Sequence, residues 1–421
     1  MKIMVFTPYL PHRRVGHGGG VAVRDLLTWL AKTHEVMVVS LIRPGEDELI
    51  SEVVSLGVKV SPIPFADANS RGLKKLSLLS QRLLAWLRSL RSGYPLYVEK
   101  YRQDALTKAA VAAVREFKPD AIQIEYTQLS LWAQALRQDF ENRGHKLPRL
   151  ILNTHELGSL PRERRAARAG NSLARFLASN EAKAWQRLQV DASHWVDTTL
   201  CVTAEDQELY EQMGGQNLQT VPLGMDLTKL KADWQPGNLD GRETYLFVGS
   251  FGHRPNVLAA RLLLDEIWPL FRKRRPAAVL VMAGRGSDDF LNGLISESEQ
   301  KKQGVEALGF VDDLTPHFRT CRLFVAPLPE GGGIKIKILE AMARGVPIVT
   351  TSVGAEGIAR PEDNILTIAE CGPSFANAME AEVSNDELSF RKATAGRRHM
   401  EAHFSWQAIA ERLSKIYAGR I

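Results

Sequence analysis

The sequence has few cysteines and no long apolar run. Three cysteines occur in 421 residues, far apart at Cys201, Cys321 and Cys371. An odd number of scattered cysteines without a C-x-x-C pair argues against a disulfide framework and against a zinc site. No apolar run approaches the roughly 20 residues that span a bilayer, and the first one ends at Thr7. These absences favour a cytoplasmic protein.

The charge balance is mildly basic, with 54 lysine and arginine residues against 48 aspartate and glutamate residues and a pI near 9.1. Such a surplus permits phosphorylated ligands, an anionic membrane face or nucleic acid as partners. No nucleic-acid-binding motif is present, so we expect no nucleic-acid partner. A hydrophobic fraction of 44% is ordinary for a globular protein, and the length predicts two or three domains.

Strand and helix patterns alternate through the first half of the chain. Helical patterns are found notably at 21–32, after a glycine triplet, and at 105–117. Strand–helix alternation predicts a parallel sheet with helices on both faces, an α/β fold. Short apolar runs predict strands at 3–7, 36–41, 58–63, 120–125, 150–153 and 199–202.

The same alternation restarts after a polar stretch at 221–241, which we interpret as an interdomain linker. Helices are expected at 257–271 and 335–344. Two such sheets in tandem predict a cleft between two domains, with ligands outside the carboxyl ends of the strands. The strands of the second sheet are expected at 245–249, 278–283, 305–308, 323–326 and 347–350.

The strongest chemical signal lies at 325–358, which reads V-A-P-L-P-E-G-G-G-I-K-I-K-I-L-E-A-M-A-R-G-V-P-I-V-T-T-S-V-G-A-E-G-I. A glycine triplet at 331–333 follows a strand and opens a helix. Glycine lets a ligand approach the backbone closely, and free N–H groups at a helix start attract phosphate. Lys335 and Lys337 add positive charge. The Glu340 carboxylate can accept hydrogen bonds from two neighbouring sugar hydroxyls.

This segment resembles the nucleotide-sugar-binding region of the retaining glycosyltransferases of family 4, which have the GT-B fold. The resemblance rests on the pattern G-G-G-x-K-x-K-x-L-E-A-M-A-x-G-x-P-x-V-x-T-x-x-G-x-E-G, which ends at Gly357. A weaker resemblance covers nearly the whole chain. It includes the N-terminal glycine loop and the residues at 224–226, 248–250, 254–256 and 404–406.

The resemblance implies a role for the matching residues in holding a nucleotide-sugar donor. Glu340 matches the glutamate that holds the nucleotide ribose, and Lys335 or Lys337 would neutralise the diphosphate. Catalytic roles are expected for Lys337 and Glu340, together with a histidine of the first domain. The expected donor-binding residues are Gly249, Arg254, Glu330, Gly331, Gly332, Gly333, Lys335, Lys337, Glu340, Gly354, Glu356 and Gly357.

Two positions depart from the family pattern. The usual pattern has two glutamates eight positions apart, but counting back from Glu340 reaches Gly332, with Glu330 two residues earlier. Many relatives carry Gly-Arg after the first strand of the second domain, whereas serine follows Gly249 here. We interpret the chain as a divergent branch in which one of the two helix lysines replaces the lysine of that loop.

Three glycines follow the first strand, Gly18, Gly19 and Gly20. A loop there can close over the diphosphate with help from Arg24, and a flexible helix entry is the alternative. The loop is not a dinucleotide fingerprint, because Val21 stands where that motif needs glycine or alanine. This weighs against an oxidoreductase.

His155 follows the strand at 150–153, so we expect it at the cleft. The resemblance suggests that it contacts the donor sugar or stabilises charge as the bond breaks, and the alternative is a histidine bonded within its own loop. Arg162, Arg164 and Arg165 are expected in a basic loop that could receive a phosphorylated or lipid-linked acceptor. A solvated charged face is the alternative there.

Residues 71–92 combine leucines at helical spacing and Trp86 with six lysines or arginines and no acid. A basic amphipathic helix can lie on an anionic membrane surface. This would place the protein peripherally at the inner membrane face. The alternative is an ordinary helix that packs its leucines on the first domain.

Together these features predict a GT-B fold with two facing Rossmann-like domains. The acceptor-binding domain is expected at 1–222, with a helix in 404–421 packed back on it, and the nucleotide-sugar-binding domain at 223–403. The predicted function is a metal-independent, hexosyltransferase-like enzyme of cell-surface polysaccharide or glycoconjugate synthesis. No Asp-x-Asp motif occurs, and no cofactor is expected besides the substrate.

The predicted reaction moves a sugar, with retention of configuration, from a UDP- or GDP-linked donor to a glycan, lipid-linked or small-molecule acceptor. Two alternatives remain open. The first is an inactive relative that binds a nucleotide-sugar or a glycan. The second is a sugar-nucleotide epimerase of the same architecture.

Overall fold

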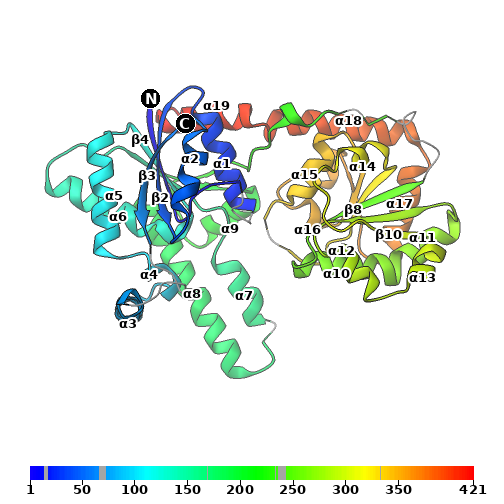
Figure 1. Ribbon diagram of the computed structural model, residues 1–421, viewed down its shortest axis with the longest axis horizontal. Coiled ribbons are helices and arrows are strands. Elements are labelled where there is room, and N and C mark those ends of the chain that lie inside the picture. The colour runs from blue at the N-terminus through cyan, green and yellow to red at the C-terminus, as the bar shows by residue number, and fades with distance from the viewer. Residues whose placement is uncertain (14–17, 66–72, 168, 233, 236–242, 332) are drawn as a thin grey trace. The chain divides into compact units, whose positions relative to one another are not determined.

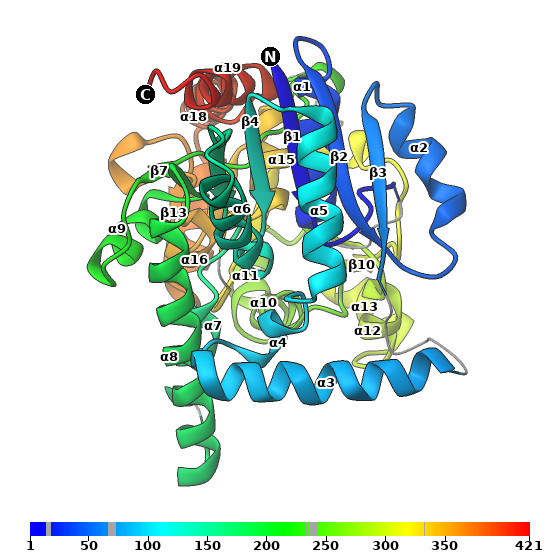
Figure 2. The same ribbon diagram turned by 90° about the vertical axis from the view of Figure 1, so that its left-hand side faces the viewer.

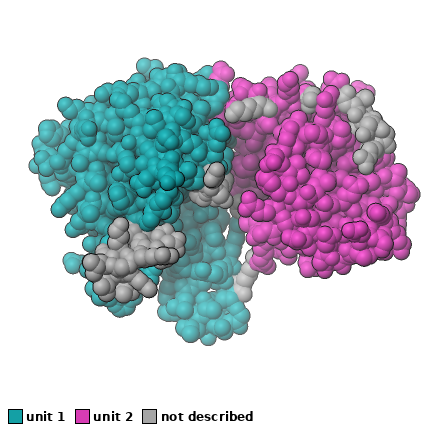
Figure 3. Space-filling model, in the orientation of Figure 1, with its two compact units in different colours: residues 1–224, 409–421 teal, residues 225–408 magenta. Residues whose placement is uncertain are grey.

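The computed structural model describes the chain except for residues 14–17, 66–72, 168, 233, 236–242 and 332. The chain divides into two compact units. Unit 1 holds Met1–Gly224 and Ile409–Ile421, and unit 2 holds Met225–Ala408 (Figure 3). Each unit is built on a parallel sheet that helices cover on both faces (Figures 1 and 2). The α/β class predicted from the alternating patterns is therefore confirmed.

The sheet of unit 1 has seven parallel strands in the order β3-β2-β1-β4-β5-β6-β7. Ile3 of β1 pairs with Val36 of β2 on one side and with Ala121 of β4 on the other. The strand order therefore reverses between β1 and β4. The strands are β1 (Lys2–Thr7), β2 (Glu35–Ile42), β3 (Lys59–Pro64), β4 (Ala121–Glu125), β5 (Arg149–Asn153), β6 (Thr198–Cys201) and β7 (Leu218–Thr220).

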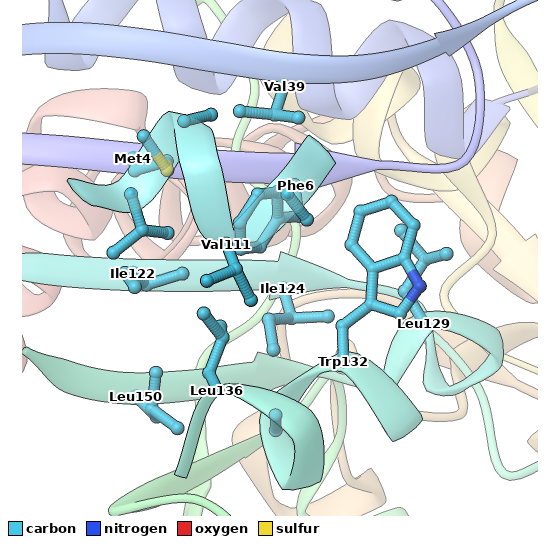
Figure 4. Packing of buried hydrophobic residues seen from close by; sticks show 14 of the residues in the cluster. Met4, Phe6, Val39, Val111, Ile122, Ile124, Leu129, Trp132, Leu136 and Leu150 are labelled. Carbon is cyan, nitrogen blue, oxygen red and sulfur yellow. The ribbon is translucent and has the colours of Figure 1, made fainter. Parts of the chain in front are cut away.

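The core of unit 1 fixes the two central strands. Phe6 of β1 meets Trp132 edge-on, with 5.3 Å between the ring centroids. Ile122 and Ile124 of β4 pack in the same buried cluster as Leu136 (Figure 4). Full burial of each such side chain contributes roughly 1.5–3 kcal/mol. The carboxyl ends of β1 and β4 are therefore held on a rigid base.

The helices of unit 1 differ from the sequence expectations in two places. The first helix begins at Gly18 itself, so the glycines are part of the helix and not a loop before it. Arg162, expected in a basic loop, lies on a helix whose residues are mostly good helix formers and whose Pro161 falls in the first turn, where a missing N–H costs no bond. The helices are α1 (Gly18–Leu30), α2 (Ile50–Val54), α3 (Leu73–Ser92), α4 (Leu96–Glu99), α5 (Asp104–Phe117), α6 (Leu131–Asn142), α7 (Ser159–Ala167), α8 (Ser172–His194) and α9 (Ala204–Gln212), with short 3-10 turns at η1 (Asp47–Leu49) and η2 (Thr127–Leu129).

The sheet of unit 2 repeats the design with six parallel strands in the order β10-β9-β8-β11-β12-β13. Its order reverses between β8 and β11, where Leu323 pairs with Tyr245. The strands are β8 (Thr244–Val248), β9 (Val279–Ala283), β10 (Val305–Ala307), β11 (Leu323–Ala326), β12 (Ile348–Thr350) and β13 (Thr367–Ile368).

One helix of unit 2 is interrupted where the sequence predicts a continuous helix at 257–271. A π turn at Leu263–Ile267 separates α10 from α11. Pro269 explains the break, because it has no N–H to donate to the preceding turn. The helices are α10 (Arg254–Leu262), α11 (Trp268–Arg274), α12 (Ser287–Asn292), α13 (Glu297–Gln303), α14 (Thr315–Thr320), α15 (Ile336–Ala343), α16 (Ser352–Ala355), α17 (Pro373–Val383) and α18 (Asp386–His403), with 3-10 turns at η3 (Leu227–Lys229) and η6 (Pro361–Asp363).

The last helix, α19 (Trp406–Tyr417), brings the end of the chain back to unit 1. The Tyr417 hydroxyl donates to Gln123 Oε1 on β4 at 2.5 Å, and both side chains are buried. His34 Nε2 lies 3.0 Å from Ser414 Oγ. Among the helices that the structure describes, none is long and apolar enough to cross a bilayer.

Candidate active site

The candidate residues of both units follow strands at the points where the sheets reverse their order. In open parallel sheets, a ligand site lies outside the carboxyl ends of the strands at such a reversal. In unit 1 the strands concerned are β1, β4 and β5, and in unit 2 they are β8, β11 and β12.

The loop between β11 and α15 depends on glycine. Gly331 has a backbone φ of +149° and Gly333 has one of +65°. Residues other than glycine rarely adopt such values. Gly332 lies outside the described residues. The two described glycines therefore serve the course of the loop, which brings the chain from β11 to the start of α15.

Lys335 is buried at the start of α15 and already has partners. Its Nζ donates to the Gly333 carbonyl at 2.6 Å and forms an ion pair with Glu356 Oε2 at 2.9 Å. Only 8% of the side chain is exposed. Lys335 thus joins the glycine loop after β11 to the loop after β12.

Lys337 lies two residues further on, in the first turn of α15, and faces the loop after β8. Its Nζ donates to Asn256 Oδ1 at 2.5 Å and lies 5.1 Å from the centre of the Phe247 ring. Burial, and then the positive charge of Lys335, lower the pKa of the Lys337 amine to about 8. Burial and the like charge of Lys335 disfavour the charged form of the Lys337 amine. An anionic ligand beside Nζ would favour the charged form, so the amine suits an anion-binding role.

The Glu340 carboxylate is held by an arginine of its own helix. Arg344 Nη2 and Nε donate to Glu340 Oε1 at 3.0 and 3.3 Å, and Arg344 Nη1 donates to Thr315 Oγ1 at 2.9 Å. Arg344 is buried, whereas a quarter of the Glu340 side chain is exposed. The arginine fixes one oxygen, and the exposed carboxylate can still accept hydrogen bonds from a ligand.

The loops after β8 and β11 are joined by charge. Arg254 at the start of α10 forms an ion pair with Glu330, with 3.3 Å between Nη1 and Oε1. Gly249 lies against Asn256, where an added Cβ would come within 2.8 Å of the amide carbon. Asn256 also donates to the Ser250 carbonyl at 2.9 Å. Asn256, for which the sequence predicted no role, thus links this loop to Lys337.

The second glycine loop combines packing with one exposed acid. A Cβ on Gly354 would lie 1.9 Å from Thr350 Oγ1, and its N–H donates to Thr351 Oγ1 at 3.1 Å. Gly354 therefore serves close packing behind the loop. Gly357 has a φ of +70°, and the Glu356 side chain remains a quarter exposed beside Lys335.

In unit 1, His155 lies in a buried network at the ends of β4 and β5. Its Nε2 contacts Glu125 Oε2 at 2.5 Å, and the Glu125 side chain is fully buried. Asn153 and Gln123 also donate to the Glu125 carboxylate. His155 Nδ1 is buried and has no hydrogen-bond partner among the described residues. The histidine was predicted from its place after a strand, whereas no sequence pattern indicated Glu125, which contacts it.

A tyrosine covers the imidazole. The Tyr126 ring stacks on His155 with 3.9 Å between centroids and an angle of 12° between the planes. Both residues have a positive φ, +70° and +58°, which is uncommon for side chains of this size and typical of functional sites. The Tyr126 hydroxyl lies 2.5 Å from that of Tyr9, and burial raises the pKa of both phenols.

The start of α1 reaches this network through a glycine. A Cβ on Gly19 would lie 1.9 Å from the Tyr126 hydroxyl, so any larger residue there would have to displace that hydroxyl. Gly18 and Gly20 are its neighbours in the first turn of α1. The structure thus brings the glycine triplet together with His155, and Tyr126 is the residue between them that the sequence did not indicate.

Two predicted arginines are engaged with other parts of unit 1. Arg24 on α1 forms an ion pair with Glu52 of α2, with 3.8 Å between Nε and Oε1. Arg162 on α7 pairs with Glu181, donates to the Gly158 carbonyl at 2.9 Å and lies over the Trp185 ring. The contacts of Arg162 join α7 to α8.

Two family models match the chain over most of its length. Residues 17–224 match the glycosyl transferase 4-like domain, and residues 242–385 match the glycosyl transferases group 1. Both models describe glycosyl transferases, so each part of the chain is similar to glycosyl transferases. The glycine loop, the lysines and Glu340 lie within the second match, and His155 lies within the first.

Curated relatives match part of this chain. A phosphatidyl-myo-inositol mannosyltransferase of Mycobacterium tuberculosis is 25% identical over 215 residues, which cover 48% of this chain and 54% of the relative. A glycogen synthase of the same species is 26% identical over 184 residues, or 42% of each chain. The matches thus span about half the length of these relatives.

Solved structures match the whole chain. Sucrose-phosphate synthase from Thermosynechococcus elongatus covers 99% of this chain with 98% of its own, at a TM-score of 0.67 and 16% identity. Anabaena Alr3699/HepE in complex with UDP covers 99% of both chains, at a TM-score of 0.66 and 13% identity. WaaG, a glycosyltransferase involved in lipopolysaccharide biosynthesis, covers both chains fully, at a TM-score of 0.59 and 15% identity. The chain therefore has the GT-B fold.

Proposed function

We propose that this glycosyl transferase moves a sugar from a UDP- or GDP-linked donor to a hydroxyl of a glycan, lipid-linked or small-molecule acceptor, with retention of configuration. We further propose that it needs no metal ion and acts in cell-surface polysaccharide or glycoconjugate synthesis. Support comes from relatives and neighbours. One relative is named a mannosyltransferase, and Anabaena HepE has been solved with UDP and with UDP-glucose.

The observation that carries the proposal is the charge arrangement at the carboxyl edge of unit 2. Two buried or half-buried lysine amines lie beside the glycine loop, and Glu340 lies one turn further along the same helix. A diphosphate needs positive charge, and a ribose needs a carboxylate that accepts from two hydroxyls. Lys335, Lys337 and Glu340 supply both on a single helix.

In the proposed reaction, Lys335 and Lys337 bind the diphosphate and stabilise the charge that develops as it leaves. The bond between the anomeric carbon and the diphosphate oxygen breaks while the acceptor oxygen bonds to the same face of that carbon. The acceptor proton passes to the departing diphosphate. His155, oriented by Glu125, is proposed to contact the donor sugar as the bond breaks.

Positioning is the main task of the protein in this scheme. Bound reactants that are held in alignment react far faster than free ones, and fixed positive charge costs no reorganisation during the reaction. The lysines, the loop amides and Arg254 supply positive charge without a metal ion. This is consistent with the absence of an Asp-x-Asp motif from the sequence.

The test is a donor and product assay on the purified chain. UDP- and GDP-sugars are supplied with and without a pool of glycan and lipid-linked acceptors, in the presence of EDTA. We expect release of nucleoside diphosphate that depends on one donor and one acceptor class, and a product whose anomeric configuration by NMR equals that of the donor. Epimerised sugar from donor alone, inversion, or loss of activity in EDTA would each contradict part of the proposal.

A further inference from the structure

From residue 83 to residue 90, the outer face of α3 is apolar and open to solvent. Leu83, Trp86, Leu87 and Leu90 recur at spacings of three and four residues, so they share one face of the helix. Between 49% and 66% of each of these residues is exposed. Ala85, on the opposite face, is buried. The helix therefore packs on unit 1 with a small residue and turns its large apolar side chains outward, the reverse of a helix on a water-exposed surface.

A second apolar group lies at the start of α8. Leu173, Phe176 and Leu177 are each about 60% exposed or more, and Ala178 beside them is buried. α7 and α8 form a hairpin, and its free end and α3 both project at the lower end of unit 1 in Figures 1 and 2. Single exposed leucines are common, but two apolar groups of this size on one end of a unit mark an interaction surface.

Positive charge flanks both groups. Arg82 and Arg91 are exposed on either side of the α3 stripe, and α3 contains no acidic residue. Arg175 is exposed within the apolar group of α8. Apolar side chains bordered by arginines complement a surface that has negative headgroups outside and acyl chains inside.

We propose that the outer faces of α3 and of the start of α8 form a docking surface for an anionic lipid bilayer. Leu83, Trp86, Leu87 and Leu90 enter the boundary between headgroups and acyl chains, where tryptophan side chains are favoured. The arginines contact the anionic headgroups. The name "docking surface" refers below to these faces of α3 and α8.

The docking surface lies at the end of unit 1 that carries Tyr126 and His155. α3 contacts α4, and α4 contacts η2, the turn that directly follows Tyr126 at the end of β4. A membrane at this surface would therefore present its headgroups near the edge that carries His155. If the protein transfers a sugar as proposed above, docking implies that its acceptor is of the lipid-linked class. This last step rests on the proposed function.

Vesicle binding of the full chain, without nucleotide or acceptor, tests the docking surface directly. We expect co-sedimentation with vesicles of phosphatidylcholine and phosphatidylglycerol, weaker binding to phosphatidylcholine alone, and loss of binding at high salt. The triple variant Leu83→Ser, Trp86→Ser, Leu87→Ser should bind at least about tenfold more weakly, because apolar burial is lost. Arg82→Gln with Arg91→Gln should weaken binding to anionic vesicles by about tenfold or more.

A matched control comes from unit 2. Phe310 is 65% exposed, and Phe310→Ser should bind vesicles as the wild type does. All substituted residues are exposed, so the variants should keep the far-UV spectrum and melting temperature of the wild type. Equal vesicle binding by the wild type and the triple variant would overturn the proposal.

Trp86 provides a readout that does not depend on affinity. It is the most exposed of the eight tryptophans. Acyl chains that carry bromine should quench its fluorescence in the bound protein, and Trp86→Phe should bind with near-normal affinity while losing most of that quenching. Bound protein whose quenching is unchanged in Trp86→Phe would show that the helix face does not enter the bilayer.

Two further outcomes separate this inference from its rivals. Self-association of the wild type in light scattering, lost in the triple variant, together with no vesicle binding, would assign the surface to a second copy and overturn the proposal. Vesicle binding as predicted in a protein that transfers no sugar would support the docking surface and contradict the proposed function. The two proposals can therefore fail separately.

Discussion

At the scale of the residue, Lys337 carries a charge that the folded protein holds at a cost. Burial and the neighbouring Lys335 lower its pKa from 10.5 to about 8. A folded pKa below the unfolded value means that the unfolded chain binds more protons between about pH 8 and 10.5. The stability of the free protein should therefore rise with pH across that window. Below it, the full cost of the buried ammonium group remains.

We predict that Lys337→Met raises the melting temperature of the free protein at pH 7, because an apolar side chain of similar length replaces a buried charge. A gain of about 1 kcal/mol corresponds to roughly 2–4 °C in a domain of this size. The gain should shrink as the pH rises above about 8. Calorimetry of both proteins from pH 6 to 10 measures it.

Lys335→Met is the matched comparison. This substitution removes the ion pair with Glu356 and the hydrogen bond to Gly333. It should lower the melting temperature, and both variants should lose the stabilisation by nucleoside diphosphates. A Lys337→Met protein that is less stable than wild type at pH 7 would contradict the claim that the buried Lys337 ammonium group destabilises the free protein.

The second residue-scale feature is the glutamate behind His155. The buried Glu125 carboxylate accepts a hydrogen bond from His155 Nε2, which keeps a proton on Nε2. Nδ1 is left available to accept a hydrogen bond from a ligand. We predict that Glu125→Gln lowers kcat about 10–100-fold with little change in the donor KM, as loss of an orienting partner does. Nitrogen NMR of the His155 ring should show the Nε2-protonated tautomer in the wild type and a changed distribution in the variant.

Glu125→Asp keeps the charge and serves as the comparison, with partial activity expected. An unchanged tautomer together with an unchanged rate in Glu125→Gln would show that Glu125 is only a core residue. The sequence could indicate His155 by its place after a strand. It could not indicate Glu125, which reads as the polar end of an ordinary apolar strand, because the contact between β4 and β5 exists only in the folded sheet.

At the scale of the element, the start of α1 is fitted to the loop after β4. Gly19 leaves room for the Tyr126 hydroxyl, and Tyr126 in turn covers His155. We predict that Gly19→Ala destabilises unit 1 and that much of this cost disappears in the background of Tyr126→Phe, which removes the clashing oxygen. A double-mutant cycle of unfolding free energies measures the coupling, which we expect to be about 0.5–3 kcal/mol.

Gly170→Ala is the control for this cycle, because an added Cβ at that position meets nothing within 4 Å. It should change stability little in either background. Costs for Gly19→Ala that are equal in both backgrounds would refute the direct contact between α1 and Tyr126.

Element positions were largely predictable from the sequence, and their details were not. Apolar runs indicated β1 and β4 to within a residue or so, because strands buried on both faces need such runs. β7 and β13 were missed, since at three and two residues they are too short to show a pattern. The π turn before α11 depends on Pro269 in a helix that otherwise reads as continuous.

At the scale of the whole molecule, the chain folds as two units, each with a parallel sheet whose strand order reverses once. The last residues of the chain belong to the first unit. The family pattern at 331–357 predicted a nucleotide-sugar site in the second unit, and the charge pairs around that pattern came from the structure. Arg344 holds Glu340, Glu356 holds Lys335, and Asn256 holds Lys337. These partners come from separate strand ends, so sequence spacing alone could not join them.

The central claim is that the carboxyl edge of unit 2 holds a nucleoside diphosphate through Glu340 and the two lysines. The most direct measurement is the melting temperature of the chain with UDP, GDP and ADP, for the wild type, Glu340→Ala and the exposed control Glu387→Ala. A ligand at 100 times its Kd stabilises the folded state by about 2.7 kcal/mol. We predict that one nucleotide raises the melting temperature of the wild type and the control by several degrees and leaves Glu340→Ala nearly unchanged. No rise with any nucleotide, or an equal rise in Glu340→Ala, would contradict the claim.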